Sequence, residues 1–240
     1  MRILVTNDDS VTAGQLLPLI RWCQKMGQVT CVVPRIEQSG KSHGIEIHEP
    51  FPYGQVQLAE DVTVYTVDST PADCVRFAVL GLQEQYDLVI SGVNRGYNIG
   101  TDAMYSGTVA AVTEAAILGI PGIALSTNPG NYERAIEHLD RVFAFIREND
   151  LLGKHSLYNI NIPPQAGPIR ITRQGGIYYS DDFKLENGLC HPLGKCVYQD
   201  QNDLTLDTDA VMHGYISIMP LSVNMTDLAV YGRLSSMNEG

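Results

Sequence analysis

The 240-residue sequence has few basic side chains: 16 lysines and arginines stand against 27 aspartates and glutamates, for a formal net charge of −11 at pH 7. A general affinity for nucleic acid or for anionic membranes depends on a basic surface that releases counterions. The charge balance therefore argues against a stable polynucleotide partner and against a membrane partner. Small anionic ligands remain compatible with the sequence, because a bound cation can hold them.

Long apolar runs are also missing. No stretch approaches the roughly 20 residues that a membrane-spanning helix needs. Only three apolar residues follow Arg2 before the first polar one, and this start is not typical of an export signal. The sequence alone thus indicates neither a membrane anchor nor secretion.

Cysteines are few, and none forms a Cys-x-x-Cys pair of the kind used for zinc or redox chemistry. The five are scattered over the chain: Cys23, Cys31, Cys74, Cys190 and Cys196. An odd, dispersed set does not predict a disulfide framework. We expect reduced thiols and a cytoplasmic protein.

Two glycine-rich nucleotide motifs are absent. Residues 39–42 read Ser-Gly-Lys-Ser, but a nucleoside-triphosphate loop needs a glycine where this chain has Arg35. No G-x-G-x-x-G follows the first apolar run, so a dinucleotide cofactor lacks its usual phosphate cradle. An NAD-type oxidoreductase fits the fold class described next but lacks this fingerprint.

The sequence does contain a regular alternation of short apolar runs and amphipathic segments. The apolar runs, typical of buried parallel strands, cover residues 3–5, 29–33, 62–67, 88–91, 123–126 and 157–162. The helical segments between them cover residues 15–26, 72–80, 107–118 and 134–148. Strand–helix–strand units at this spacing predict an α/β fold with a doubly wound, mostly parallel sheet.

Beyond Pro164 the pattern changes to short β-like pieces, with an Asn187-Gly188 hairpin signal and no further convincing helix before the last residues. We expect a single domain over residues 1–240, with an α/β core at about 1–165 and a C-terminal β-rich arm and tail at about 166–240. A β arm that extends from such a core is a common way to grip a second subunit. A homodimer or homotetramer is therefore expected.

Asp8 and Asp9 directly follow the first predicted strand and Asn7. Open α/β sheets bind ligands beyond the carboxyl ends of their strands, so these two carboxylates face a site. Carboxylates that converge must share a proton or hold a cation, and oxygen donors suit Mg²⁺, Mn²⁺ or Ca²⁺ better than zinc. Both can grip one ion only if the chain turns here, and residues 10–14 supply that turn. The alternative is an Asp-rich loop that merely caps the next helix.

Two later loops leave the same edge of the sheet, and each carries an oxygen donor. Ser39 lies in the loop after the second strand, and Asn94 lies in the polar loop over residues 92–102. With Asp8 and Asp9 they form a small, open set of oxygen donors that leaves room on Mg²⁺ for water and a phosphate oxygen.

Ser106, Gly107 and Thr108 stand at the start of the predicted helix over residues 107–118. The free N–H groups and positive dipole end of this helix face the same region and favour an anion. The two hydroxyls would add donors, Gly107 would let a phosphate approach the backbone, and Asn98 would donate its amide. The alternative is plain N-capping.

Asp203, Asp207 and Asp209 form a rival acidic cluster, which we interpret as the solvated face of a β-like stretch outside the sheet edge. His43 lies in the same loop as Ser39. It would transfer a proton or touch substrate there, or serve the structure alone.

An ordered series of motifs spans the chain: Asn7-Asp8-Asp9, Ser39-Gly40, Thr70-Pro71-Ala72-Asp73-Cys74-Val75, Ser91-Gly92-Val93-Asn94, Tyr105-Ser106-Gly107-Thr108-Val109, and later blocks within 159–163, 172–175 and 208–220. Together they resemble the survival protein SurE family. The resemblance implies a Rossmann-like core, a C-terminal arm used in dimer formation, and metal-dependent hydrolysis of nucleoside 5′- and 3′-monophosphates.

Carried over by position, the family's metal ligands fall on Asp8, Asp9, Ser39 and Asn94, the four residues that the sheet edge selects. Mg²⁺ or Mn²⁺ is the expected cofactor, with Ca²⁺ as an alternative occupant in a crystal. The chain departs from the family pattern at Ser10 and Ser69, where glycine is usual, and over residues 192–203, which match poorly. A side chain at position 10 disfavours a positive φ and restricts the turn.

The leading hypothesis is a phosphomonoesterase in which Asp8 or Asp9 is both ligand and general acid or base. Direct attack by water and a covalent aspartyl-phosphate both stay open. The competing hypothesis is a non-catalytic nucleotide-binding or sensing module on the same sheet edge.

Overall fold

The computed structural model describes residues 1–237, which form a central nine-stranded sheet with strand order β3-β4-β2-β1-β5-β6-β7-β11-β8 and a separate hairpin. The strands are β1 (Arg2–Thr6), β2 (Gln28–Pro34), β3 (Tyr53–Ala59), β4 (Val62–Val67), β5 (Leu88–Arg95), β6 (Gly122–Thr127), β7 (Leu157–Ile162), β8 (Ile169–Ile171), β9 (Tyr179–Glu186), β10 (Leu189–Cys196) and β11 (Ile216–Pro220). The run from β4 to β7 is parallel, while β3 and β11 pair antiparallel with β4 and β7. The expected mostly parallel α/β sheet is confirmed.

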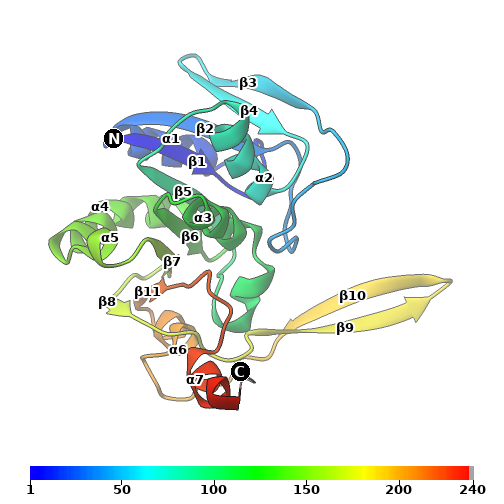
Figure 1. Ribbon diagram of the computed structural model, residues 1–240, viewed down its shortest axis with the longest axis vertical. Coiled ribbons are helices and arrows are strands. Elements are labelled where there is room, and N and C mark those ends of the chain that lie inside the picture. Colours follow the sequence, from blue (N-terminus) through cyan, green and yellow to red (C-terminus); the bar gives the residue numbers. More distant parts are fainter. Residues whose placement is uncertain (238–240) are drawn as a thin grey trace.

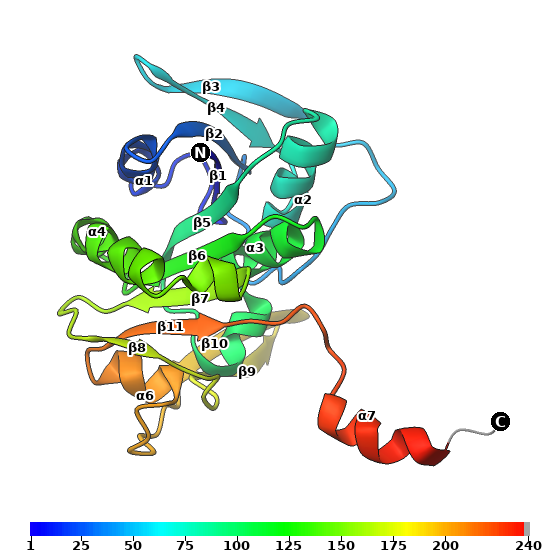
Figure 2. The same cartoon turned by 60° about the vertical axis from the view of Figure 1, so that its left-hand side comes forward.

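Helices cover both faces of this sheet (Figure 1). The α-helices are α1 (Leu16–Gln24), α2 (Pro71–Arg76), α3 (Gly107–Ile117), α4 (Tyr132–Glu148), α5 (Leu151–Lys154), α6 (Asp207–Met212) and α7 (Leu228–Leu234). A π-helix, η1 (Phe77–Gly81), continues α2, and short 3-10 helices form η2 (Gly100–Tyr105) and η3 (Ser235–Met237). In Figure 2, α1 and α4 lie on one face of the sheet and α2 and α3 on the other, which is the doubly wound arrangement.

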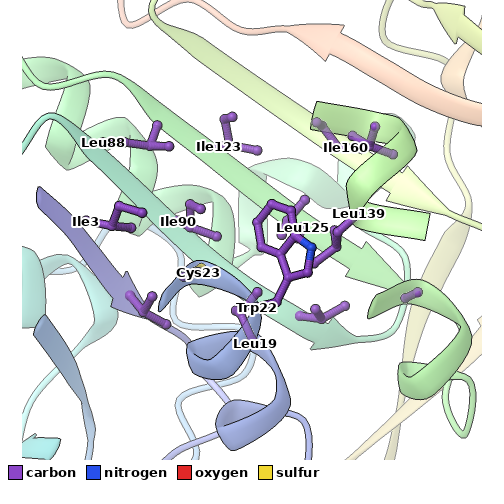
Figure 3. Close-up of a cluster of buried hydrophobic side chains, with 14 of the residues drawn as sticks. Ile3, Leu19, Trp22, Cys23, Leu88, Ile90, Ile123, Leu125, Leu139 and Ile160 are labelled. Atoms are coloured by element: carbon purple, nitrogen blue, oxygen red, sulfur yellow. The ribbon is translucent and has the colours of Figure 1, made fainter. Parts of the chain in front are cut away.

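The strands feed two apolar cores, because neighbouring residues of a strand point to opposite faces. Ile3 enters the core under α1 and α4, whereas Leu4 enters the core under α2 and α3. Figure 3 shows the first core, which contains Trp22 of α1 and Leu139 of α4. The Trp22 Nε1–H donates to Asp140 Oδ1 at 2.7 Å, so this ring links the two helices without leaving its donor unpaired.

Helix α3 packs closely against the sheet. Its small side chains are buried along most of its length, and a Cβ added at Gly122 of β6 would lie 2.8 Å from Val112 Cβ. Such close packing needs alanine and glycine at the contact. It also fixes where the N-terminus of α3 meets the carboxyl edge of the sheet.

Two elements project from the body: the hairpin β9–β10 in Figure 1 and α7 in Figure 2. The turn residues of the hairpin, Asn187 and Gly188, have φ values of 52° and 75°, as the expected tight hairpin turn requires. Both elements expose large apolar side chains: Phe183, Leu185, Leu189 and Leu193 on the hairpin, and Leu228, Tyr231 and Leu234 on α7.

The segment after residue 165 contributes to the core as well as to the arm. β8 and β11 return to the edge of the main sheet, and α6 packs against β11. The sequence analysis did not identify β3, which is largely exposed, or the short helix α6. Within residues 1–237, no helix is both long enough and apolar enough to cross a membrane.

Candidate active site

The candidate site lies at the carboxyl edge of the sheet, between β1 and β5. From β1 the chain winds outward to β2 and β4, then returns to β5 and winds the other way to β6 and β7. The crevice at such a switch point is where open α/β sheets bind ligands. Asp8 and Asp9 follow β1, and Asn94 lies near the end of β5.

The turn after β1 is held by its own side chains. Asn7 Nδ2 donates to the Ser10 carbonyl oxygen at 3.0 Å, and Ser10 Oγ lies 3.0 Å from Thr12 Oγ1. Ser10 has a φ of +74°, a left-handed conformation that costs a residue with a side chain about 1–2 kcal/mol. The serine therefore occupies a backbone position that favours glycine.

Asp8 points at the first turn of α3 and is only 3% exposed. Its Oδ1 accepts a hydrogen bond from Thr108 Oγ1 at 2.6 Å. A Cβ added at Gly107 would lie 3.2 Å from Asp8 Oδ2, so glycine is what lets the helix approach this carboxylate. Ser106 caps the helix, because its Oγ accepts the Val109 N–H at 3.1 Å. The positive end of α3 thus faces Asp8.

Asp9 is held between the start of α1 and the end of β5. Its Oδ2 accepts hydrogen bonds from Gln15 Nε2 at 2.7 Å and from the Arg95 N–H at 3.1 Å. Neither partner stood out in the sequence. The only available signal was their position, since Gln15 precedes the helix that follows β1, and Arg95 ends β5.

A bulge in β5 brings Arg95 to Asp9. Ser91 pairs with Ala124 and Asn94 with Ser126, so Gly92 and Val93 together oppose one residue of β6. Gly92 has a φ of +136°, and a Cβ there would lie 2.3 Å from the Leu125 carbonyl oxygen, so the bulge requires glycine.

Asn94 itself lies between this bulge and Arg95. Its Nδ2 donates to the Gly96 carbonyl oxygen at 2.9 Å. The amide nitrogen is therefore engaged within the loop, and the side-chain oxygen is the atom suited to bind a cation.

The Ser39 loop, residues 37–44, touches the acidic turn through its backbone. The Gln38 N–H donates to the Asp8 carbonyl oxygen at 2.8 Å. Ser39 Oγ donates to Glu37 Oε1 at 2.7 Å, and Glu37 Oε2 lies 3.6 Å from the Arg95 guanidinium. The structure thus brings together the elements that carry the four expected ligands, while the ligand role of each residue stays a prediction.

The charged forms of both carboxylates are disfavoured in the folded protein. Burial raises the pKa of Asp8 above its ordinary 3.8, although the Thr108 hydrogen bond opposes this shift. Burial, and then the charge of Asp8, raises the pKa of Asp9 to about 6. The backbone N–H and the charge of Arg95 oppose the shift at Asp9 only in part, so a divalent cation would favour the charged form of both acids.

The donor set decides which cation fits. Within residues 1–237, no group of three or more His, Cys, Asp or Glu side chains converges as a metal cluster. A cation at this edge would therefore be held by two carboxylates and neutral oxygen donors. Mg²⁺ and Mn²⁺ suit that chemistry, and zinc does not.

Asn98, expected to contact phosphate, lies in a buried amide network. Its side-chain Nδ2 donates to Ser126 Oγ at 2.8 Å. Its backbone carbonyl oxygen accepts from Asn159 Nδ2 at 2.7 Å and from Asn161 Nδ2 at 3.0 Å. This network fixes the loop after β5 against β6 and β7. One amide hydrogen is therefore used within the fold, and a phosphate contact through the other stays a prediction.

Sequence reasoning missed a buried charge network behind the Ser39 loop. Glu114 of α3 is 4% exposed. Its Oε2 lies 2.8 Å from His43 Nε2, and its Oε1 accepts from Arg76 at 3.2 Å. These contacts favour the structural interpretation of His43, as an anchor of the loop. A single carboxylate on an otherwise apolar, alanine-rich helix was the signal that could have revealed the network.

The interpretation of the C-terminal acidic cluster as a solvated face is wrong for Asp207 and Asp209, which are both 0% exposed. Asp207 accepts the N–H groups of Gly100 at 2.9 Å and Gly175 at 2.7 Å. Asp209 accepts the Asp203 N–H at 2.9 Å. Buried carboxylates need such partners, which come from distant loops for Asp207 and from the segment just before α6 for Asp209.

Comparisons with known proteins agree with this geometry. The family model for survival protein SurE matches residues 3–181. The 5′-nucleotidase SurE of Thermosipho melanesiensis is 37% identical over 254 residues, covering 100% of this chain and 98% of that protein. The 5′-nucleotidase SurE of Natranaerobius thermophilus is 35% identical over 257 residues, covering 98% of both. The crystal structure of the SurE protein from Aquifex aeolicus superimposes with a TM-score of 0.80 at 28% identity and covers 100% of both chains.

Replacing Ser10 by glycine or by alanine separates backbone strain from side-chain bonding. Both changes remove the contact with Thr12, but only glycine adopts a φ of +74° without a Cβ penalty. We expect the glycine variant to be more stable than the alanine variant by about 1 kcal/mol. The strain relieved by glycine, about 1–2 kcal/mol, exceeds the cost of the entropy that glycine adds to the unfolded chain. Urea denaturation measures the difference, and equal midpoints would show that the turn relaxes.

The raised pKa of Asp9 predicts that the metal-free protein loses stability as pH rises. The unfolded chain releases this proton near pH 3.8 and the folded chain near pH 6. Between these values the folded state binds one more proton than the unfolded state. The unfolding free energy therefore falls with rising pH across this window and levels off above about pH 7. Asp9→Asn carries no charge at any pH. In EDTA we compare the unfolding free energy of this variant with that of the wild type at two pH values. The difference, variant minus wild type, should be larger near neutral pH than near pH 4, by up to about 3 kcal/mol.

Asp203→Asn is the matched control for this titration. Hydrogen bonds from Thr205 lower the pKa of Asp203, so its charge favours the folded state above the unfolded pKa and the variant should lose stability near neutral pH. If both variants respond to pH in the same direction, the assignment for Asp9 is wrong.

Proposed function

The chain belongs to the survival protein SurE family, and from this membership and the site between β1 and β5 we propose that it is a metal-dependent phosphomonoesterase. The proposed substrates are nucleoside 5′- and 3′-monophosphates, which it splits into nucleoside and phosphate. The relatives named 5′-nucleotidase SurE support a nucleotidase. The contact of Asp8 with Thr108, which sets paired carboxylates against the first turn of α3, is the observation that carries the proposal.

The phosphate group is proposed to bind at the N-terminus of α3, where free N–H groups and the helix dipole favour an anion. Ser106, Gly107 and Thr108 supply this surface, and Asn98 assists from the neighbouring loop. Asp8 lies against the same turn and would repel a phosphate at this distance. A divalent cation held by these carboxylates would offset that repulsion.

Asp8, Asp9, Ser39 and Asn94 are the proposed ligands of Mg²⁺ or Mn²⁺. When bound, this cation offsets the phosphate charge and lowers the pKa of a water molecule. Thr108 fixes the orientation of Asp8, and Gln15 with the Arg95 N–H fixes that of Asp9. Their positions are therefore set before substrate arrives, which favours a reaction that depends on alignment.

Asp8 and Asp9 are the proposed catalytic residues, with different tasks. Water attack on phosphorus breaks the bond to the ribose oxygen, which must then gain a proton. Asp8 is 3% exposed and clamped, whereas Asp9 is half-buried and opens to a cavity. Because proton exchange needs access to solvent or substrate, we assign the proton transfer to Asp9.

Asp8→Asn and Asp9→Asn should each lower kcat for AMP and GMP by about 10²-fold or more, since each change removes a ligand charge and Asp9→Asn also removes a proton carrier. Phosphate release from the 5′ and 3′ isomers is measured with Mn²⁺ or Mg²⁺ and again with EDTA, which should abolish it. Asp203→Asn, on the far acidic cluster, should keep wild-type activity. Near-full activity in either site variant would overturn the assignment.

The same assay separates the competing function, a non-catalytic nucleotide-binding or sensing module. Such a module predicts that AMP binds and that no phosphate appears with either metal. Calorimetric AMP binding without phosphate release would therefore favour the module over the enzyme.

We propose a homodimer or homotetramer in which the hairpin β9–β10 and α7 pack against another copy. Leu185 is 78% exposed and Leu228 is 65% exposed, and apolar patches of this kind on projecting elements mark interaction surfaces.

Replacing both Phe183 and Leu185 by aspartate should lower the mass measured by light scattering at micromolar concentration, because charged side chains would be buried in the interface. Lys184→Gln, on the same strand, is the control and should leave the mass unchanged. A wild-type protein that is monomeric at micromolar concentration would contradict the proposal.

We also propose a cytoplasmic location. All five cysteines are free thiols, and a reducing compartment keeps thiols in that state.

A further inference from the structure

A cavity of about 260 Å³ opens directly beside the paired carboxylates. Asp9 forms part of its wall. The lining also includes Gln15 at the N-cap of α1, Glu37 of the Ser39 loop, Arg95 of β5 and Tyr132 of α4. The cavity is therefore built from loops on both sides of the switch point. In the proposed mechanism this space serves only to open Asp9 to solvent or substrate.

The position of the cavity matters because a phosphate bound at α3 restricts the directions in which the rest of a substrate can extend. On one side, Asp8 is covered by Thr108 and Gly107. On the other, the carboxylate of Asp9 faces the open volume. A group attached to that phosphate would extend past Asp9 and into the cavity.

The chemistry of the wall favours a base and a sugar. Tyr132 is the aromatic residue of the lining, and burial and the nearby charge of Asp9 raise its pKa to about 12, so the ring stays neutral. Aromatic rings stack on every kind of nucleobase, because each base has a π-face. Glu37 supplies a carboxylate that accepts hydrogen bonds from hydroxyl groups.

A second cavity of about 450 Å³ is a rival. Arg95 also lines it, and Tyr97, Tyr178 and Tyr179 offer aromatic surfaces. Asp9 is not part of its wall. A nucleoside there would lie beyond Arg95 and would not be contiguous with the acidic pair, so the smaller cavity is the better candidate.

We propose that the cavity beside Asp9 holds the nucleoside part of the substrate and that Tyr132 is the stacking surface for its base. The inference rests on the proposed phosphomonoesterase activity. It makes Tyr132 a specificity residue, which distinguishes nucleotides from other phosphate esters without taking part in the reaction.

The test compares AMP with ribose 5-phosphate, which carries the same phosphorylated ribose and no base. Tyr132→Leu should raise KM for AMP about 10-fold, since stacking on one aromatic ring contributes that order of affinity. It should leave kcat/KM for ribose 5-phosphate within about 2-fold of the wild type, because the lost contact is made only to the base. Tyr132→Phe keeps the ring and should behave as the wild type on both substrates.

Tyr97→Leu is the matched control in the rival cavity and should change neither substrate. If Tyr97→Leu raises KM for AMP and Tyr132→Leu does not, the base lies in the larger cavity and the proposal is wrong. Equal losses on AMP and ribose 5-phosphate in Tyr132→Leu would also overturn it, because they would indicate a general structural effect.

Adenosine binding, measured by calorimetry, tests the subsite without turnover. The wild type and Tyr132→Phe should bind adenosine, and Tyr132→Leu should bind it about 10-fold more weakly. A wild type that hydrolyses neither ester but shows this pattern would contradict the proposed function and support the subsite. Equal adenosine affinity in wild type and Tyr132→Leu would contradict the subsite itself.

Discussion

The burial of two adjacent carboxylates at one sheet edge is the constraint on which the site depends. An uncompensated buried charge costs several kcal/mol, and Asp8 is 3% exposed with Asp9 beside it. The fold supplies the Thr108 hydroxyl, the positive end of α3 and the Arg95 N–H. These groups carry partial charges, and both pKa values stay raised. The protein alone therefore leaves the charged form of both acids disfavoured, which a bound divalent cation would offset, so stability is sacrificed where the chemistry is proposed to occur.

The parts of this arrangement that obey local rules could be predicted from the sequence. The position of Asp8 and Asp9 needs only a buried strand followed by a turn, because the carboxyl ends of parallel strands share one edge. Ser106 caps α3 as its residue type suggests. The turn over residues 10–14 follows the same logic, since the chain must turn there to bring both carboxylates to one place, but the left-handed φ of Ser10 does not, because a side chain disfavours it.

The rest depends on contacts that no local pattern encodes. Asp207 and Asp209 look like surface residues in the sequence, yet Asp207 is buried because it binds the N–H of Gly100, a residue 107 positions away. The hydrogen bond from Arg95 to Asp9 exists only because β5 bulges at Gly92. Asn98 was selected as a free amide, but its partners on β6 and β7 become visible only once the strands lie side by side.

These long-range contacts also join the arm to the site. The N–H of Tyr179, the first residue of the hairpin, donates to Asp102 Oδ2 at 3.1 Å, and Asp207 holds Gly100 of the same loop. The Ser39 loop is also held by hydrogen bonds. The Ser42 N–H donates to the Tyr105 carbonyl oxygen at 3.0 Å, and His43 pairs with Glu114. The loop that contains Asn98 is thus fixed from the arm side, and the Ser39 loop from α3. In the proposed oligomer, a second copy that packs on the hairpin would therefore restrain the loop that contains Asn98 through Asp102 and Asp207, and assembly would be coupled to the alignment of the site.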